Sequence, residues 1–332
     1  MTLSSNIEGI LVIPRLKVQN ANAISSPMTW GFPAISAFLG LMQALDRKLP
    51  AHIELMLDQV GVVCHNFEPQ VTEGGYTRAF RLTRNPVSRD GSTAAISEEG
   101  RAHIEISLIF GVTGQAVNLN DSQRQTVAEE IGHIVEGMRI AGGSVVPGRR
   151  KGKAWQSRPR LTPVADSRDE WLQQFRLLRR QLLPGFALVS RHDLLEKRLT
   201  ELHNENPAAT ALDAWLDLSR LHVYPETHGD SEGEDSDMNG KVEWQVRRPP
   251  GWTVPIPVGY GALSDVFEPG QVARARDNTT PFRFVETLYS IGEWVSPHRL
   301  HSIEDLLWRA EAEPDAGIYQ CTNSYGDRRL NA

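Results

Sequence analysis

Two runs with alternating side chains restrict what this chain can fold into. In residues 10–18 (ILVIPRLKV), Ile10, Val12, Leu16 and Val18 alternate with polar Arg15 and Lys17. Residues 102–111 alternate Ile104, Ile106 and Leu108 with His103, Glu105 and Ser107. A period of two predicts strands with one buried face, here carrying the apolar side chains of each run. Because proline donates no ladder hydrogen bond, the first strand should be bulged or lie at an edge near Pro14.

Helical periodicity lies between the expected strands. In residues 33–48 the apolar positions Ile35, Phe38, Leu39, Met42 and Leu45 share one helical face. Further strands are expected at residues 60–67 and 76–83, and a second helix at residues 122–139. Two glycines follow it, Gly142 and Gly143, which permit either a positive φ or close approach of another backbone. The order strand, helix, strands, helix, followed by a glycine-rich turn, is the order expected of an α+β chain with a ferredoxin-like fold.

The second half of the chain alternates helical and extended runs. Helices are expected at residues 170–183, 193–203, 210–220 and 303–309, with Asp193 as a helix cap. Extended runs are expected at residues 185–190, 252–260 and 281–294. With 332 residues, the chain exceeds the size at which one core usually stops growing, so one domain with insertions, or two domains, is expected.

Charge is segregated along the chain. Residues 226–243 hold seven acids against Lys241, which is the whole net charge of -6. Residues 147–183 hold ten Arg and Lys against three acids, a local charge of +7. Local fields steer association, so the segregation suits a partner with a charged backbone better than the net charge suggests.

Several enzyme chemistries lack support. Cys64 and Cys321 are too few for a disulfide framework or a zinc site and should be small buried hydrophobes. The nucleophile-elbow pattern at residues 229–233 lies in an acidic loop without the flanking strand and helix. Glu130 and His133 have di-iron spacing but no second copy of the motif. No cofactor, no metal and no catalytic residue are therefore expected.

The expected location is the cytoplasm. No run approaches the roughly 18 consecutive apolar residues of a membrane span, so no membrane association is expected. The first residues, MTLSSNIEGI, also lack a basic start followed by an apolar run.

Long strings of residues identify a relationship. They are IPRLKVQNANAISSPMTWGF, LTRNPVSRDGSTAAISEEGRAH, RIAGGSV, LLPGFALVSR, GWTVPIPVGY and GEWVSPHR. These strings, spread over nearly the whole chain, resemble the RAMP-type subunit that binds the CRISPR RNA 5′ handle in type I-F CRISPR surveillance (Csy, or Cascade) complexes, the second subunit of that complex. The resemblance implies an antiviral-defence protein that grips this handle for DNA targeting. It also implies three partners: the large subunit, the first backbone subunit, and target DNA near the protospacer-adjacent motif.

The resemblance also implies a domain organisation. Residues 1–148 would form a modified ferredoxin-like (RRM-like) palm, with an inserted β-hairpin thumb at about residues 76–110. Residues 149–225 would form a basic, helical insertion with one short strand, residues 226–241 an acidic mobile loop, and residues 242–332 the segment that completes the palm and the partner surface. The basic residues 147–160 would contact RNA, duplex DNA or a neighbouring subunit, and the sequence does not choose among them.

A non-catalytic role is favoured over the alternative, a repeat-RNA-processing endoribonuclease. Enzymes of the wider RAMP group tend to use a histidine near the first helix, whereas residues 34–48 contain none.

Three loops carry the candidate RNA-binding residues. The thumb loop, residues 83–101, offers Arg84 and Arg89 for phosphates and Asn85 and Ser92 for bases. Residues 19–30 offer Asn20, Asn22, Ser25 and Ser26, whose alternative role is hydrogen bonding within a turn. Gly142 and Gly143 would admit a phosphate to the backbone or merely relieve packing. Arg15, Trp30, Ser144 and Arg299 lie in the segments that carry the resemblance and complete the candidate set.

Overall fold

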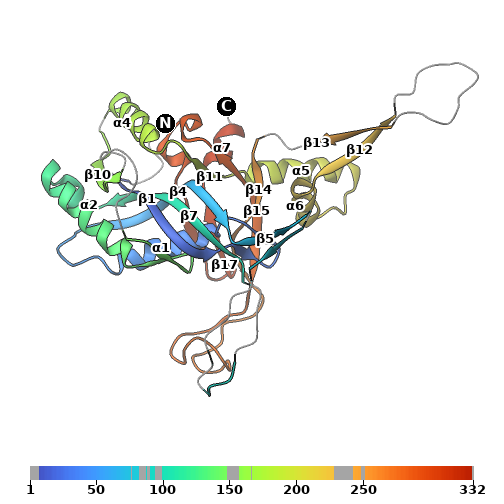
Figure 1. The fold of residues 1–332 in the computed structure, drawn as a ribbon, viewed down its shortest axis with the longest axis horizontal. Helices are drawn as coiled ribbons and strands as arrows, with labels where there is room; N and C mark the ends of the chain where they lie inside the picture. Colours follow the sequence, from blue (N-terminus) through green and yellow to red (C-terminus); the bar gives the residue numbers. More distant parts are fainter. Residues whose placement is uncertain are drawn as a thin grey trace, which may run out of the picture.

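The computed structural model describes residues 7–75, 77–81, 87, 90–93, 99–147, 157–165, 167–227, 242–247 and 251–330. Within these residues the chain forms one eleven-stranded antiparallel sheet with helices on its faces, and is therefore α+β (Figure 1). The strands run in the order β16-β17-β14-β15-β11-β4-β7-β1-β9-β8, and β10 also pairs with β1.

The strands of the large sheet have the following bounds: β1 Gly9–Asn22, β4 Met56–Pro69, β7 Arg101–Thr113, β8 Arg139–Ile140, β9 Gly143–Val145, β10 Arg160–Pro163, β11 Phe186–Ser190, β14 Thr253–Ala262, β15 Val285–Val295, β16 Arg309–Glu313 and β17 Ile318–Thr322. Three two-stranded ribbons lie apart from it: β2 Ile24–Ser26 with β3 Thr29–Trp30, β5 Val71–Gly74 with β6 Thr77–Phe80, and β12 His222–Thr227 with β13 Val242–Arg247. The helices in the described residues are α1 Ile35–Asp46, α2 Asp121–Glu136, α4 Arg168–Gln181, α5 His192–Glu205, α6 Ala211–Ser219 and α7 Tyr325–Leu330, with 3-10 turns η1 Gln115–Asn118, η2 Pro297–Arg299 and η3 Ile303–Asp305.

The strand β1 is bulged beside Pro14, as expected. Its register with β7 shifts between Ile13 and Leu16, and Arg15 has a φ of 54°. An extra residue in a strand reverses which side chains point to which face of the sheet. The alternation of side chains before the bulge in β1 is therefore opposite to the alternation after it. Leu16 and Val18 belong to the core under α1, whereas Ile10 and Val12 belong to the core on the other face. The prediction that these four side chains share one face is therefore wrong.

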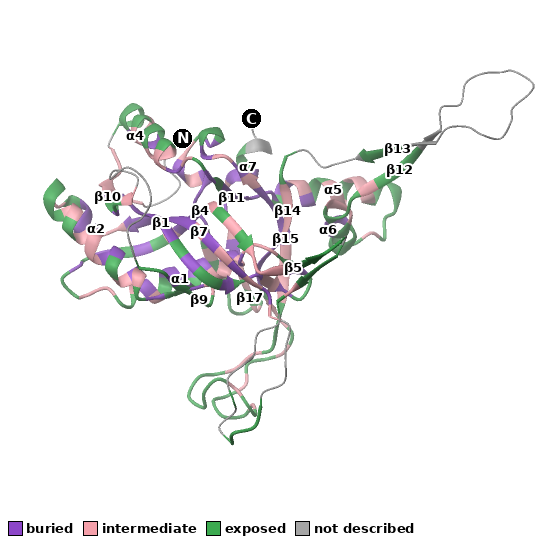
Figure 2. Cartoon of the chain, in the orientation of Figure 1, coloured by how far each residue is buried: buried purple, intermediate pink, exposed green. Residues whose placement is uncertain are grey.

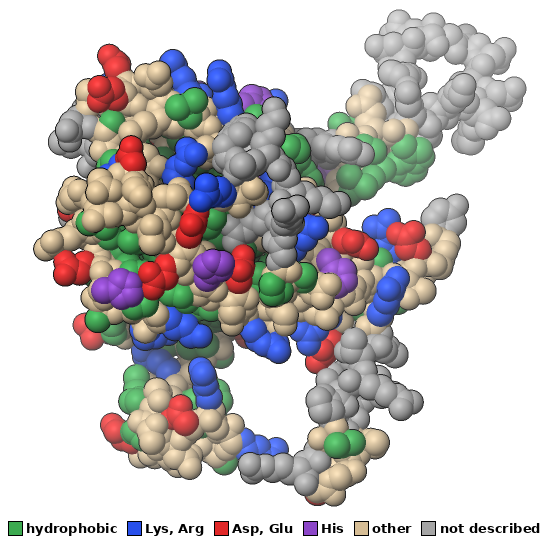
Figure 3. All heavy atoms as spheres, turned by 60° about the vertical axis from the view of Figure 1, so that its left-hand side comes forward, with side chains coloured by type: hydrophobic (Ala, Val, Ile, Leu, Met, Phe, Trp, Pro, Cys, Tyr) green, Lys and Arg blue, Asp and Glu red, His purple; other side chains and the backbone are tan. Residues whose placement is uncertain are grey.

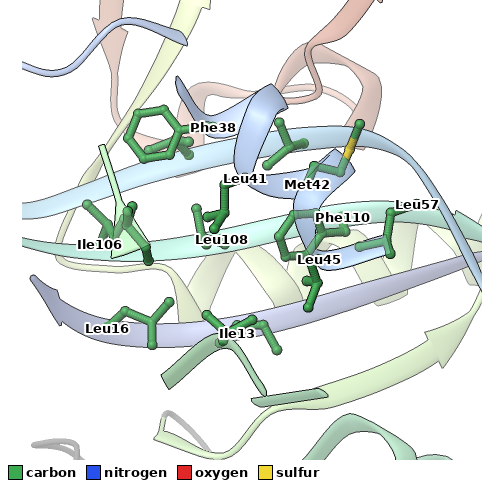
Figure 4. Close-up of a cluster of buried hydrophobic side chains, with 14 of the residues drawn as sticks. Ile13, Leu16, Phe38, Leu41, Met42, Leu45, Leu57, Ile106, Leu108 and Phe110 are labelled. Carbon is green, nitrogen blue, oxygen red and sulfur yellow. The ribbon is translucent and has the colours of Figure 1, made fainter. Parts of the chain in front are cut away.

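The main core lies between α1, α2 and the centre of the sheet. All five apolar residues predicted to line the face of α1 are buried. Figure 4 shows how α1 meets the sheet: Phe38, Leu41, Met42 and Leu45 of α1 lie over Ile13, Leu16, Leu108 and Phe110. The residues of α2 join the same cluster through Ala128, Ile131 and Val135. Burial of this kind contributes roughly 1.5–3 kcal/mol per large side chain, so this layer fixes the position of α1.

Other helices cover the remaining faces. Trp171 and Phe175 of α4 and Tyr325 of α7 pack into a second cluster on the opposite face of the sheet. A third, smaller cluster joins α5 and α6 to β15 through Leu195, Trp215 and Ile291. Figure 2 shows that the β12–β13 ribbon and the loop after β14 project from the body with exposed side chains.

The C-terminal part differs most from expectation. The helix predicted at residues 303–309 is only the short turn η3, after which Trp308 is fully buried and β16 begins. The indole Nε1 of Trp308 donates a hydrogen bond to the Leu188 carbonyl at 2.8 Å, and its backbone pairs with Val60. Tertiary contacts across the sheet therefore override the local helical pattern.

The strands at the two ends of the main strand order are short or charged. At one end lies β8, which has two residues. At the other lies β16, whose sequence RAEAE is largely exposed. Within the expected thumb range, about residues 76–110, β6 pairs with β5 in a separate ribbon, and the first residues of β7 belong to a central strand of the sheet.

Candidate nucleic-acid interface

Two clefts meet at the N-terminus of α1. The first, named here the open cleft, has a volume of about 610 Å³ and is lined by Asn22, Ser25, Ala34, Ser36, Ala37, Ala141, Gly142, Tyr260 and Tyr319. The second, named the aromatic cleft, has a volume of about 540 Å³. Ser25 and Ala34 line both, so the two clefts adjoin.

The N-terminus of α1 is electrically suited to an anion. Its N-cap residue, Ala34, offers no side-chain acceptor, and no acidic residue occupies the first turn. The first N–H groups of a helix lack intrahelical partners and carry the positive end of the helix dipole. Because Ala34, Ser36 and Ala37 line the open cleft, this helix end faces it.

The two glycines of the β8–β9 turn have different roles. Gly142 has a φ of +77°, and a Cβ on it would meet only the Arg101 guanidinium at 4.0 Å. A Cβ on Gly143 would lie 2.6 Å from the Gln19 carbonyl oxygen, because β9 packs directly on β1. Gly142 therefore allows the turn and Gly143 the packing, so each of the two expected uses of glycine occurs. Only Gly142 lines the open cleft.

Arginines lie beside this turn. Arg139 is exposed and donates from Nη1 to the Gly142 carbonyl at 3.0 Å. Arg101 donates to the Asn20 carbonyl at 3.4 Å and pairs with Glu99. Figure 3 shows further Lys and Arg side chains along the lower edge of the body.

Residues 19–30 comprise the end of β1 and the β2–β3 ribbon, and several of their polar groups bond to one another. Asn22 donates from Nδ2 to the Ile24 carbonyl at 2.7 Å and accepts from the Ile24 N–H. The hydroxyls of Ser25 and Ser26 lie 2.8 and 2.6 Å from the Thr29 hydroxyl, and Ser26 is buried. Asn20, at a φ of 57°, accepts from Gln70 at 2.6 Å. Asn22 and Ser25 still line the open cleft, together with Gly142.

The other described candidates do not line the open cleft. Arg15 ties the β1 bulge to the Leu183 carbonyl at 3.1 Å and to Glu105 at 3.2 Å. Ser144 is exposed on β9, and Arg299 is exposed in η2. Ser92 donates from N and Oγ to Asp90, and these bonds lower the pKa of that carboxyl. Arg84, Asn85 and Arg89 lie outside the described residues.

Sequence reasoning missed the aromatic cleft. Its rings come from six separated positions: Trp30, Phe32, Phe67, Phe186, Trp252 and Trp294. Phe32 meets Trp294 edge-on at 4.9 Å, and Phe186 meets Trp252 edge-on at 5.1 Å between ring centres. Trp30 and Trp252 remain 58% and 56% exposed at the rim. No single aromatic motif in the sequence predicts this cleft, because its lining residues come from separate elements. These elements include β4, β11, β14, β15 and the start of α1.

The aromatic cleft is uncharged. Its described lining contains no Lys, Arg, Asp or Glu. Burial lowers the pKa of His65 to about 4, so its ring is neutral at pH 7; Nδ1 lies 2.6 Å from the Pro184 carbonyl and Nε2 2.7 Å from the Ser107 hydroxyl. Burial raises the pKa of Cys64 to about 12, which keeps the thiol protonated. Asn66 is exposed at the cleft, and within the described part of the chain its amide makes no hydrogen bond.

Residues considered for enzyme chemistry have ordinary partners. Glu130 meets His52 at 3.2 Å, and His133 meets Glu136 at 3.5 Å. Among the described residues, no three His, Cys, Asp or Glu gather as a metal site would require. The elbow pattern at residues 229–233 lies outside those ranges. No helix in the described segments is long and apolar enough to cross a bilayer.

Comparison with known proteins identifies relatives over nearly the whole length. The family model described as CRISPR-associated protein (Cas_Csy2) matches residues 11–321. The CRISPR-associated protein Csy2 of Pseudomonas aeruginosa (strain UCBPP-PA14) is 48% identical over 316 residues, which is 94% of each chain. The chain therefore belongs to the Csy2 family of CRISPR-associated proteins of the type I-F system.

Proposed function

We propose that this chain is a non-catalytic subunit of a type I-F CRISPR interference complex that grips the 5′ handle of CRISPR RNA. The observation that carries the proposal is the open cleft, where candidate residues from two separate segments meet at one helix end: Asn22 and Ser25 from residues 19–30, and Gly142 from the β8–β9 turn. The family supports the role in a CRISPR complex.

The phosphate backbone of the handle would lie in the open cleft. There the first turn of α1 offers N–H groups without a side-chain cap, and Gly142 lets a ligand approach its backbone. The guanidinium of Arg139 would neutralise a phosphate beside that turn. Asn22, already bonded to Ile24, would contribute mainly the shape of the turn.

The sheet supports a ferredoxin-like palm as the base of this site. In such a palm two βαβ units interlock, so that the last strand of one lies beside the first strand of the other. The order β4-β7-β1-β9, with α1 and α2 in one core cluster, agrees with that arrangement. We also propose the domain division given above, the thumb loop with Arg84, Asn85 and Arg89 as part of the grip, and the cytoplasm as the location.

The proposed partners follow from the same role. They are the large subunit, the first backbone subunit, and target DNA near the protospacer-adjacent motif. No observation favours the endoribonuclease. The one histidine among the described lining residues of the two clefts, His65, already contacts Pro184 and Ser107 with both ring nitrogens.

The test uses the full chain, alone and co-expressed with the other subunits of its complex. RNA carrying the 5′ handle of the host CRISPR RNA is titrated against the same bases in scrambled order, and the RNA is then examined for cleavage. We expect tighter binding of the handle and intact RNA. Equal affinity for both sequences would contradict handle recognition, and metal-independent cleavage at one position would establish the endoribonuclease.

A further inference from the structure

We infer that the aromatic cleft receives one unstacked nucleobase of the RNA strand whose phosphates lie in the open cleft, with Trp252 as the stacking ring and Asn66 as the reader of the base edge. This inference rests on the proposed function, because it assumes that RNA occupies the open cleft.

The lining of the aromatic cleft selects the chemistry of its occupant. Without a charged side chain among its described lining residues, it gives a phosphate no cationic partner. Six aromatic rings instead offer flat, polarisable walls, and bases stack on such rings in single-stranded RNA. A volume of about 540 Å³ lies within the usual range for ligand pockets, roughly 300–1,000 Å³.

The entrance suits a base that arrives from outside. Trp252 is 56% exposed and Phe186 is 42% exposed, so their rings stand at the mouth of the cleft. Trp294, Phe32 and Phe67 lie deeper and are partly buried. Trp30 stands at the rim on the side of the β2–β3 ribbon, where its ring meets Phe80 edge-on at 5.6 Å.

A polar group is present where a base edge would need one. The Asn66 amide combines one donor and one acceptor side by side, and it is unbonded within the described residues. Such an amide pairs in a bidentate manner with N6 and N7 of adenine. The neutral ring of His65 adds no charge that would attract a phosphate instead. We therefore assign adenine as the preferred base.

The position of the cleft connects it to the strand. Ala34 and Ser25 line both clefts, so a strand in the open cleft passes the mouth of the aromatic cleft at the end of α1. A nucleotide there would turn its base inward while its phosphate stays near the first turn of the helix. This arrangement separates the charged and the flat parts of one nucleotide into two environments that suit them.

The experiment combines protein variants with abasic RNA. Handle RNAs, each with one base removed, are titrated against the wild-type chain, Trp252→Ala and Asn66→Ala. Trp244→Ala is the matched control, because Trp244 is an exposed tryptophan, 64% accessible, on the separate β12–β13 ribbon. Thermal melts of each variant establish that it is folded.

We expect Trp252→Ala to weaken binding of intact RNA by roughly 5- to 150-fold, the range for loss of one stacked base. Removing one particular base from the RNA should lower its affinity for the wild-type chain by a similar factor. The same removal should not lower its affinity for Trp252→Ala any further. Asn66→Ala should lower the preference for adenine at that position and leave the salt dependence unchanged, since an amide releases no counterion. Trp244→Ala should behave as wild type.

Two outcomes would overturn the inference while leaving the proposed function intact. In one, every abasic site lowers the RNA affinity of Trp252→Ala by the same factor as it lowers that of the wild-type chain. In the other, Trp252→Ala releases a co-purified subunit but binds all RNAs normally, which would make the cleft a seat for a protein side chain. Failure of the wild-type chain and its complex to bind handle RNA at all would instead remove the proposed function.

Discussion

A buried ion pair between Arg191 and Glu293 joins the end of β11 to β15. Each side chain is only 8% exposed. Arg191 also donates from Nε to Asp193 at 2.9 Å, so one cation lies between two buried carboxylates. Asp193, which the sequence suggested as a helix cap, is therefore a partner of Arg191; the N-cap residue of α5 is Arg191 itself.

Replacing Arg191 with Met should destabilise the fold strongly. The change would leave two carboxylates buried without a cation, and removal of one partner from a buried pair typically costs about 3–5 kcal/mol. Urea unfolding of the two proteins would measure the difference. Arg309→Met is the matched control: Arg309 and its partner Glu311 are about half exposed, so the midpoint should hardly move. Equal midpoints for Arg191→Met and wild type would contradict the buried-pair argument.

The free energy of unfolding should decrease as the pH is lowered from 6.5 to 4, and protonation of His65 should cause part of that decrease. Burial lowers its folded pKa from 6.5 to about 4, so in this range the unfolded chain binds a proton that the folded chain does not. The free energy of unfolding therefore rises with pH across this window, by at most about 3 kcal/mol in total. Melting temperatures of wild type and His65→Gln at several pH values would show it. The variant should have a flatter profile, and parallel profiles would exclude His65 as the cause.

The two glycines of the β8–β9 turn should respond differently to substitution. Gly143→Val places a side chain 2.6 Å from the Gln19 carbonyl oxygen, so β9 must move away from β1, with a loss of roughly 1–3 kcal/mol or more. Gly142→Asn keeps a residue type that tolerates positive φ, and it should leave the melting temperature nearly unchanged. Thermal unfolding separates the two. Similar melting temperatures for both variants would show that β9 can shift freely.

Salt dependence should identify arginines that bind phosphate. On single-stranded RNA, removing one arginine–phosphate interaction lowers the slope of log K against log salt by about 0.7. We expect that decrease for Arg139→Ala, and about 1.4 for Arg84→Ala combined with Arg89→Ala. Asn85→Ala should instead reduce discrimination between handle sequences at an unchanged slope.

The control for these titrations is Arg47→Ala, because Arg47 is exposed at the opposite end of α1. Its slope should match that of wild type. If Arg139→Ala also keeps the wild-type slope, Arg139 only supports the turn through its bond to the Gly142 carbonyl.

Periodicity predicted the parts of the fold whose burial follows the local sequence. The five apolar residues of α1 are buried as expected, and the bulge at Pro14 follows from proline chemistry. The face of the sheet on which Ile10 and Val12 lie was not predicted correctly, because the residue inserted at the bulge moves them to the opposite face from Leu16 and Val18. The final strands escaped prediction for another reason. The residues of β16 are mostly exposed, and pairing with β17 rather than an apolar pattern defines them.

Part of the site was also accessible from the sequence. Asn22, Ser25, Gly142 and Trp30 do line the two clefts at α1. Trp252 and Asn66 were not found, because nothing in either local sequence reveals that β14 and β4 come together at one cleft. Arg15 was a candidate because it lies in a segment that carries the resemblance, and only the tertiary structure discloses its bonds to the Leu183 carbonyl and to Glu105.

The outer strands of the large sheet determine how well this subunit resists aggregation before it joins its complex. An open sheet has rows of unpaired backbone groups along its outer strands, here β8, β10 and β16, where another copy of the chain would add its own edge and start a growing aggregate. At one end β8 is only two residues long, too short to hold an incoming strand. At the other, β16 presents Arg309, Glu311 and Glu313 to any approaching copy. We expect the sheet to stay finite in a crowded cell, so that newly made chains remain available to their partners.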